Sequence, residues 1–265
     1  MLNYYSKKYN EGSPVITDEA YDNFYFDLAE LERRSGLILE DSPTKAKNIP
    51  KILEKIEVIN YPYKKTFFKE TMNPKEVIDF CNKTPVTAMV EPEGVKCFLH
   101  YNNGYLVTAV TEGENNTGNN IINHVLALAP QIPRRIKYKK ELILEGVFTY
   151  NLNQLSADFF KNNKSIEDYI FQKITSLNFE DIINANLQFF VIDVIKGFEN
   201  YTTSFRKKIV YLYEEGFIFP ARNWYLNIID RSIIEILRQE GDGYGIFFKK
   251  ARFRVNEIQE NTHSL

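Results

Sequence analysis

The sequence predicts an α+β protein, with a separable helical segment before a region of short strands. Three observations support this class. Apolar runs bounded by turn residues begin near Val86, helical periodicities interrupt these runs irregularly, and 44% of the 265 residues are hydrophobic. Such mixed order is typical of α+β architecture and not of a regular parallel sheet. The length allows one large domain with a small appendage.

The N-terminal 40 residues are expected to be helical. Phe24, Leu28 and Leu31 recur at i, i+4 and i+7, and neighbouring tyrosines widen this apolar stripe. Asp18 is the expected N-cap of this helix, and Ser35-Gly36 is the expected stop. The sequence Asp-Ser-Pro-Thr at 41–44 then predicts the start of an extended link.

Beyond this link, short strands and helices are predicted in turn. Asn102-Asn103-Gly104 lies between two apolar runs and predicts a hairpin, because asparagine and glycine accept positive φ at low cost. The other expected strands cover 142–150, 187–195 and 245–250. The other expected helices cover 74–82 with Asn73 as cap, 119–128, 166–183, 204–215 and 232–238.

Composition excludes several functional classes. The net charge is −2 with a pI near 6.0, so there is no global basic field to hold nucleic acid. Local basic runs at 134–140 and 206–208 are best read as solvated faces. Cys81 and Cys97 are too few for a four-cysteine zinc site, and no signal segment or 18-residue apolar run is present. We therefore expect a cytoplasmic protein with no membrane contact, and the AT-rich residue usage is typical of a viral or low-GC host.

Residues 89–118 carry the most informative pattern. Met89-Val-Glu-Pro-Glu-Gly94 leads into a strand, a turn and a second strand, followed by Thr111-Glu-Gly113 and Gly118. This segment resembles the active-site region of NAD-dependent DNA ligases, in which K-x-D-G is followed by two strands and R-G-D-G-x-x-G. The spacing matches without a gap.

Other landmarks extend this resemblance over nearly the whole chain. Leu187-Gln-Phe-Phe190 resembles the family's L-x-F-F strand, and Tyr244-Gly-Ile-Phe-Phe-Lys249 resembles its D-G-V-V-I-K motif. The resemblance implies a nucleotidyltransferase fold of two packed antiparallel sheets over 46–265, after a small nicotinamide-binding subdomain over 1–45. It assigns NAD binding to four residues: Asp18, Tyr21, Asp22 and Lys249. The first three also fit an N-cap, a packed aromatic and a solvated acid, because i, i+3 and i+4 share one helical face.

The catalytic positions of the family are degenerate. Glu91 falls on the nucleophilic lysine, Glu93 on the aspartate of K-x-D-G, and Glu112 on the arginine of R-G-D-G. Val147 replaces a glutamate of the third motif, whose arginine falls on Glu145. Family chemistry needs a lysine amine to attack the α-phosphorus, with cations to stabilise the charge there. Of the positions compared, only the late lysine survives, as Lys249.

Two further features bear on the lost chemistry. Lys96 has the opposite strand parity to Glu91, so we expect it to face away and offer no substitute nucleophile. Glu91, Glu93, Glu112 and Glu114 would form an acidic cluster if the strands pair as in the family, either a divalent-cation site or a solvated cleft. The histidines show no ligand spacing, so no metal centre is assigned.

Three functional classes follow from the resemblance. The favoured one is a pseudoenzyme that binds a partner protein or a nucleotide, with NAD the candidate cofactor. The second is an accessory protein that still contacts NAD or, weakly, nicked DNA. The third is a nucleotidyltransferase with relocated chemistry. Full ligases continue into further DNA-binding domains, whereas this sequence ends soon after Lys249, so we expect no complete ligase.

Overall fold

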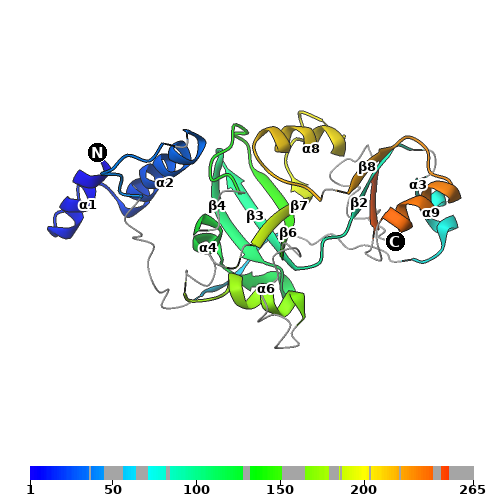
Figure 1. The fold of residues 1–265 in the computed structure, drawn as a ribbon, viewed down its shortest axis with the longest axis horizontal. Helices are drawn as coiled ribbons and strands as arrows, with labels where there is room; N and C mark the ends of the chain where they lie inside the picture. The colour runs from blue at the N-terminus through cyan, green and yellow to red at the C-terminus, as the bar shows by residue number, and fades with distance from the viewer. Residues whose placement is uncertain are drawn as a thin grey trace. The chain divides into compact units, whose positions relative to one another are not determined.

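The computed structural model describes most of the chain and divides it into two compact units, Met1–Leu53 and Glu54–Leu265. The described residues are 1–35, 37–44, 56–63, 71–81, 84–127, 132–150, 165–178, 185, 187–202, 204–220, 222–240 and 246–250. Figure 1 shows the fold of each unit.

Unit 1 holds two helices, α1 (Leu2–Asn10) and α2 (Asp18–Ser35). The cap of α2 is Thr17 and not the expected Asp18, since the Ala20 N–H donates to the Thr17 hydroxyl at 3.2 Å. Threonine and aspartate are both good caps, so sequence alone does not place the boundary to one residue. The apolar stripe is also less buried than its period suggests, with Phe24 45% and Leu31 64% exposed.

The segment after α2 turns back instead of running on as an extended link. The Asn3 side chain donates to the Asp41 carbonyl at 2.8 Å, and the Thr44 hydroxyl donates to the buried Glu32 carboxylate. Ser42 adds a hydroxyl contact to Thr44 at 2.9 Å. These bonds tie residues 41–44 to both helices of unit 1.

Unit 2 is built on an antiparallel sheet with the strand order β4-β3-β6-β7. The strands are β3 (Val95–Asn102), β4 (Tyr105–Thr111), β6 (Leu142–Tyr150) and β7 (Leu187–Lys196). The β3–β4 turn has φ of 50° at Asn103 and 81° at Gly104, which confirms the predicted hairpin. The main core combines this sheet with residues of α4 (Ile122–Ala127), α6 (Ile166–Ile174) and α8 (Phe205–Glu214).

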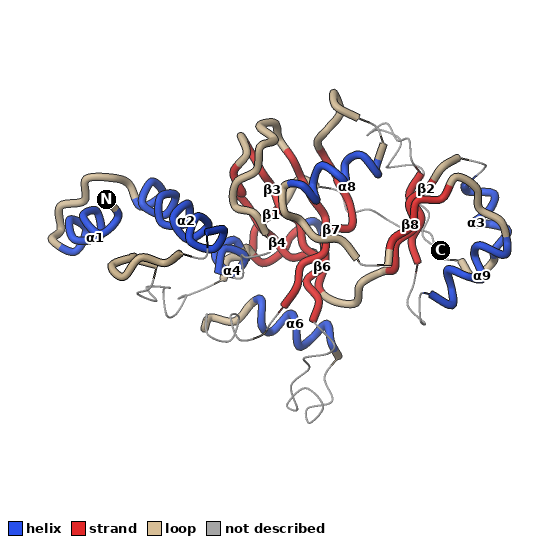
Figure 2. Tube along the Cα trace, turned by 45° about the horizontal axis from the view of Figure 1, so that its top comes forward, coloured by secondary structure: helices blue, strands red, loops and turns tan. Residues whose placement is uncertain are grey.

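A second sheet has the order β8-β2-β9 and its own core. Its strands are β2 (Val86–Val90), β8 (Asn223–Leu226) and β9 (Ile246–Lys250), and it is covered by α3 (Pro74–Cys81) and α9 (Arg231–Glu240). The tube in Figure 2 shows α3 and α9 beside this sheet. Both sheets are antiparallel and helices pack on them, so the α+β class is confirmed.

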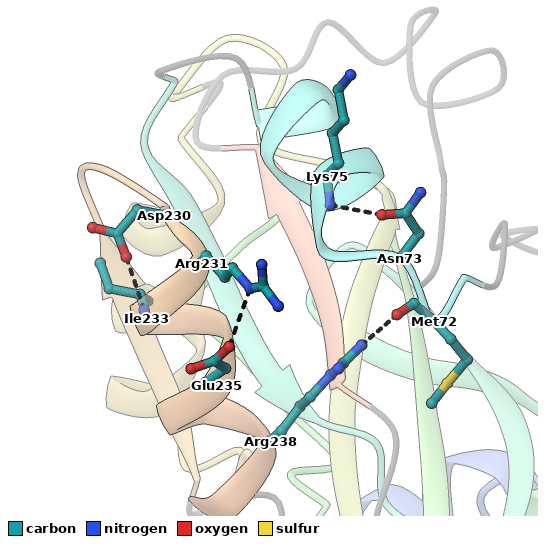
Figure 3. A network of polar contacts seen from close by, with 8 residues as sticks. All are labelled: Met72, Asn73, Lys75, Asp230, Arg231, Ile233, Glu235 and Arg238. Atoms are coloured by element: carbon teal, nitrogen blue, oxygen red, sulfur yellow. Dashed lines mark hydrogen bonds and ion pairs between the residues drawn. The ribbon is translucent and has the colours of Figure 1, made fainter.

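Polar contacts hold the two covering helices (Figure 3). Asn73 accepts from the Lys75 N–H at 3.0 Å, as predicted, and Asp230 accepts from the Ile233 N–H at 2.9 Å. Arg238 of α9 donates to the Met72 carbonyl at 2.7 Å. The helix termini are therefore capped, and α9 is tied to the start of α3.

Several elements depart from their expected bounds. The strand pair β1 (Val58–Asn60) and β5 (Thr117–Asn119) was not foreseen, nor was β8. Because β5 uses the first residue expected in the helix over 119–128, α4 starts later, at Ile122. The helix expected over 166–183 ends at Ile174, and positions 179–184 lie outside the described residues. Three-residue strands carry too few alternations to be recognised by period.

Candidate functional site

Glu91 and Glu93 lie in the connection between β2 and β3, where the family motif would place its nucleophile. Both are exposed. Gly94 follows with φ +151°, and a Cβ there would meet the Phe148 carbonyl oxygen at 1.9 Å. Only glycine fits such a close backbone approach. The local backbone beside Glu91 and Glu93 therefore requires glycine at position 94.

Lys96 does not face away from Glu91. Its Nζ lies 3.7 Å from Glu91 Oε1, in an ion pair whose lysine and glutamate side chains are 31% and 47% exposed. The parity prediction was wrong because alternation holds only within one continuous strand. Here the connection that contains Gly94 separates the strands and reorients the chain.

Glu112 follows β4 and lies beside the start of β3. Its N–H donates to the Lys96 carbonyl at 2.8 Å. Burial raises the pKa of the Cys97 thiol well above its usual value, and the negative charge of Glu112 adds to this effect. Glu112, which is predicted to stand at a family arginine position, thus lies next to the start of β3.

The third-motif positions lie on β6 and are buried. Val147 is fully buried and pairs in register with Lys96 of β3 and Phe190 of β7. Glu145 is 1% exposed and lies opposite Asp193 of β7. Neighbouring antiparallel positions direct their side chains to the same face, so two carboxyl groups share one side of this sheet.

Lys249 forms a buried ion pair with Asp193. The pair joins β9 of the three-stranded sheet to β7 of the four-stranded sheet, and each side chain is 5% exposed. The Lys249 ammonium also lies 5.2 Å from the centroid of the Phe205 ring, on α8. Lys249, predicted to be the retained lysine of the last family motif, therefore has a carboxylate of its own chain as a direct partner.

Lys208 lies close to this pair, and the prediction that its basic run is solvated was wrong for this residue. It is only 6% exposed. Burial lowers the pKa of Lys208, and Lys249 lowers it further, while Asp193 and Glu199 oppose the shift. Sequence reasoning also missed Asp193, although it is the one acidic residue in the apolar strand Leu187–Ile195. That exception to the strand pattern was the available signal.

Unit 1 contains a pocket of about 300 Å³ at the predicted nicotinamide-binding segment. Its lining consists of Tyr5, Ser6, Tyr9, Pro14, Val15, Ile16 and Tyr21. Tyr21 is thus the predicted cofactor residue that lines the pocket, and its ring stacks on Tyr25 at 6.4 Å. The side chains of Asp18 and Asp22 lie outside the described part of the chain.

No metal centre is found in the part of the chain that the structure describes. No three His, Cys, Asp or Glu side chains gather there in a metal-binding group. Glu91, Glu93, Glu112 and Glu114 are therefore not part of such a group in the described residues. Glu91 is instead paired with a lysine.

Three cations of the basic runs lie over aromatic rings. Arg135 and Lys139 lie 5.3 and 5.8 Å from the centroid of the Tyr105 ring, and Arg206 lies 4.5 Å from that of Tyr225. Such contacts are ordinary uses of a cation on a protein surface. Separately, none of the helices described in the structure is long and apolar enough to cross a membrane.

Two antiparallel sheets joined by the motif-bearing connections define a nucleotidyltransferase-like adenylation domain. Residues 35–172 match the family model for the NAD-dependent DNA ligase adenylation domain, which is just over half of the chain. The chain belongs to this family.

Curated relatives agree with this assignment. The DNA ligase of Brachyspira hyodysenteriae is 28% identical over 253 residues, which cover 88% of this chain and 37% of the relative. The DNA ligase of Alkaliphilus oremlandii is 30% identical over 169 residues, 59% of this chain and 25% of the relative. That of Lachnoclostridium phytofermentans is 25% identical and covers 78% of this chain and 32% of the relative. The matches thus span from 25% to 37% of the length of these ligases.

Proposed function

We propose that this chain is a catalytically degenerate adenylation module that binds NAD through its nicotinamide half and does not adenylate itself. The observation that carries the proposal is the Glu91–Lys96 ion pair. In the family a lysine amine at position 91 would attack phosphorus. Here that position presents a carboxylate, and the nearby lysine is engaged with it.

The chemistry of this pair argues against phosphoryl attack. An ion-paired ammonium has no lone pair for attack on phosphorus, and nucleophilic lysines require one. A phosphate also meets a carboxylate at Glu112, and a carboxylate paired with Lys96 at Glu91, where the family provides cations. Two unit charges 4 Å apart repel by about 4 kcal/mol at an effective dielectric of 20. Both effects oppose the lysine-dependent step.

The pocket of unit 1 supports the binding half of the proposal. Tyr5, Tyr9 and Tyr21 line it, and its volume of about 300 Å³ is at the small end of the range of ligand sites. The nicotinamide ring of NAD carries a positive charge, which favours contact with aromatic faces. We propose Asp18 and Asp22 as further groups for this half of the cofactor and Lys249 for its other half, in each case on the resemblance.

Calorimetric titration of NAD, nicotinamide mononucleotide and AMP, with and without magnesium, tests this function. We expect NAD and nicotinamide mononucleotide to bind, and Tyr21→Ala to weaken both by about tenfold or more. Tyr4→Ala is the matched control, because Tyr4 is 53% exposed and is not among the pocket-lining residues. If NAD does not bind, the proposal that the chain binds NAD is wrong. If mass spectrometry detects an AMP adduct on the protein, the proposal that the chain does not adenylate itself is wrong.

A role beside nicked DNA is the second candidate, favoured by the DNA ligases among the relatives. The net charge of −2 predicts weak, salt-sensitive binding. A gel shift with nicked and intact duplexes would distinguish it, since only nick preference supports it. If both titration and gel shift are negative, the remaining alternative is a protein partner. A cytoplasmic location accompanies each of these proposals.

A further inference from the structure

Four acidic and basic side chains in the described part of unit 2 are buried close to one another in strand register or in space. Two of them, Glu145 and Lys249, are predicted to stand at motif positions, and the other two are not. Glu145, Asp193, Lys208 and Lys249 are 1%, 4%, 6% and 4% exposed. They come from four elements, namely β6, β7, α8 and β9. Buried charges are tolerated only where they are paired or hydrogen-bonded.

The Asp193 carboxylate is engaged at both oxygens. Oδ2 binds Lys249 Nζ, and Oδ1 accepts a hydrogen bond from the Val194 N–H at 2.7 Å. Glu145 lies opposite Asp193 in the register of β6 and β7 and adds a second carboxyl group on the same face. The two lysines, Lys208 and Lys249, thus have carboxyl groups of the chain itself nearby.

A phosphate would compete with Asp193 for Lys249. A lysine ammonium binds phosphate as a point charge, and one carboxylate already in contact supplies the same compensation. A phosphate brought to Lys249 would either displace Asp193 or lie beside it. Displacement leaves a buried carboxylate without its partner, and the second arrangement places like charges together in a site of low dielectric.

We propose that Asp193 is a specificity-determining residue whose carboxylate occupies the place of a nucleotide phosphate on Lys249. The chain therefore prefers an uncharged nucleoside to the corresponding nucleotide at this site. This inference deepens the proposed function and rests on its nucleotide site, but it concerns the phosphate end and not the nicotinamide pocket of unit 1.

Titration of adenosine and AMP into the wild type and Asp193→Asn measures this preference. Asparagine keeps the oxygen that accepts from Val194 and removes the charge. We expect the ratio of AMP affinity to adenosine affinity to rise by about tenfold or more in the variant. Glu141→Gln is the matched control, since it removes one carboxylate from an exposed pair with Lys196 at 2.5 Å. The control should leave the ratio unchanged.

The double variant Asp193→Asn with Lys249→Met should lose the gain, because the gain requires the released lysine. If Asp193→Asn fails to fold, Asp193→Ser provides a smaller neutral side chain for the same titrations. An unchanged ratio, a gain that survives Lys249→Met, or no binding by any of the proteins overturns the inference. If NAD binds but the ratio of AMP affinity to adenosine affinity is unchanged, the proposed role of Asp193 is contradicted and the nicotinamide pocket is not. If the ratio rises but the protein does not bind NAD, the proposed nicotinamide pocket is contradicted and the role of Asp193 is not.

Discussion

At the residue scale, the most consequential groups are ionisable side chains removed from water. Burial lowers the pKa of Lys208, and it lowers the pKa of His100 and of His124. Each of these shifts disfavours the charged form in the folded protein. The folded state therefore binds fewer protons than the unfolded state, so stability rises with pH across the affected windows.

Replacement of Lys208 by methionine should stabilise the protein at pH 7 by about 1 kcal/mol, because a buried charge is exchanged for an apolar chain of similar length. The advantage should shrink as the pH rises from the lowered pKa toward the usual value of 10.5, where the wild-type lysine becomes neutral. Urea unfolding at several pH values measures the difference. If the methionine variant is less stable at pH 7, the attraction of Lys208 to Asp193 and Glu199 outweighs the cost of burying its charge.

His124 should contribute to acid sensitivity. Its Nε2 lies 2.9 Å from the Ser176 carbonyl oxygen, and burial is the main cause of its lowered pKa. Wild-type stability should fall as the pH drops below the usual value of 6.5 toward the folded pKa. In His124→Gln, which retains a donor but does not titrate, the slope should be smaller. It should not vanish, since the pKa of His100 is lowered too; an unchanged slope would exclude His124 as a contributor.

At the element scale, helix ends and glycine contacts fix the local structure. Asp230 caps α9, and Asn73 caps α3. Where β5 meets β4, a Cβ at Gly118 would lie 1.9 Å from the Thr111 carbonyl oxygen. These features were partly visible as sequence signals, and the structure shows which of them carry contacts.

Asp230→Ala should lower the free energy of unfolding of unit 2 by about 1 kcal/mol, because the Ile233 N–H loses its acceptor. Asp230→Asn keeps an acceptor oxygen and should change stability by only a few tenths of a kcal/mol. Chemical denaturation of both variants provides the comparison. Equal losses would show that the charge of Asp230, and not the cap, supports α9.

Gly118→Ala should be much more damaging, with a cost of about 2–4 kcal/mol, since its Cβ would collide with backbone and neither strand can move easily. Gly12→Ala is a useful contrast. Gly12 has φ +71° but nothing lies within 4 Å of its Cβ position, so only backbone strain of about 1 kcal/mol is expected. Similar losses at the two positions would indicate that the strand contact adapts.

At the scale of the whole molecule, the chain consists of two compact units with separate packing. In unit 1 the Thr44 hydroxyl donates to the Glu32 carboxylate, and in unit 2 the sheets and their helices form their own cores. Compact units of this kind can unfold as independent cooperative transitions.

Thr44→Val should therefore shift one calorimetric transition and leave the other in place. It removes the hydroxyl that serves the buried Glu32, so a loss of about 1–3 kcal/mol is expected in unit 1. Asp230→Ala should shift only the transition of unit 2. If both variants move a single common transition, the units unfold as one.

Much of the fold was predictable because its signals are local. The hairpin at Asn103-Gly104, the strand Leu142–Tyr150 and the Asn73 cap each depend on residues within a few positions of one another. The three-residue strands β1 and β5 were not predictable, because their pairing joins segments far apart in the chain. The candidate site shows the same contrast. The motif positions could be predicted from the sequence, and the residues that contact them could not.

Order and spacing along the chain were enough to identify the family and the α+β class, and they predict that Glu91 stands at the position of the nucleophilic lysine. Only the tertiary structure decided that Lys96 pairs with Glu91, and that Lys249 pairs with Asp193 beside the buried Lys208. The physical reason is that Coulomb interactions and burial depend on distance in space. The connection between β2 and β3 sets the first of these distances and the approach of β9 to β7 sets the second, and strand parity does not.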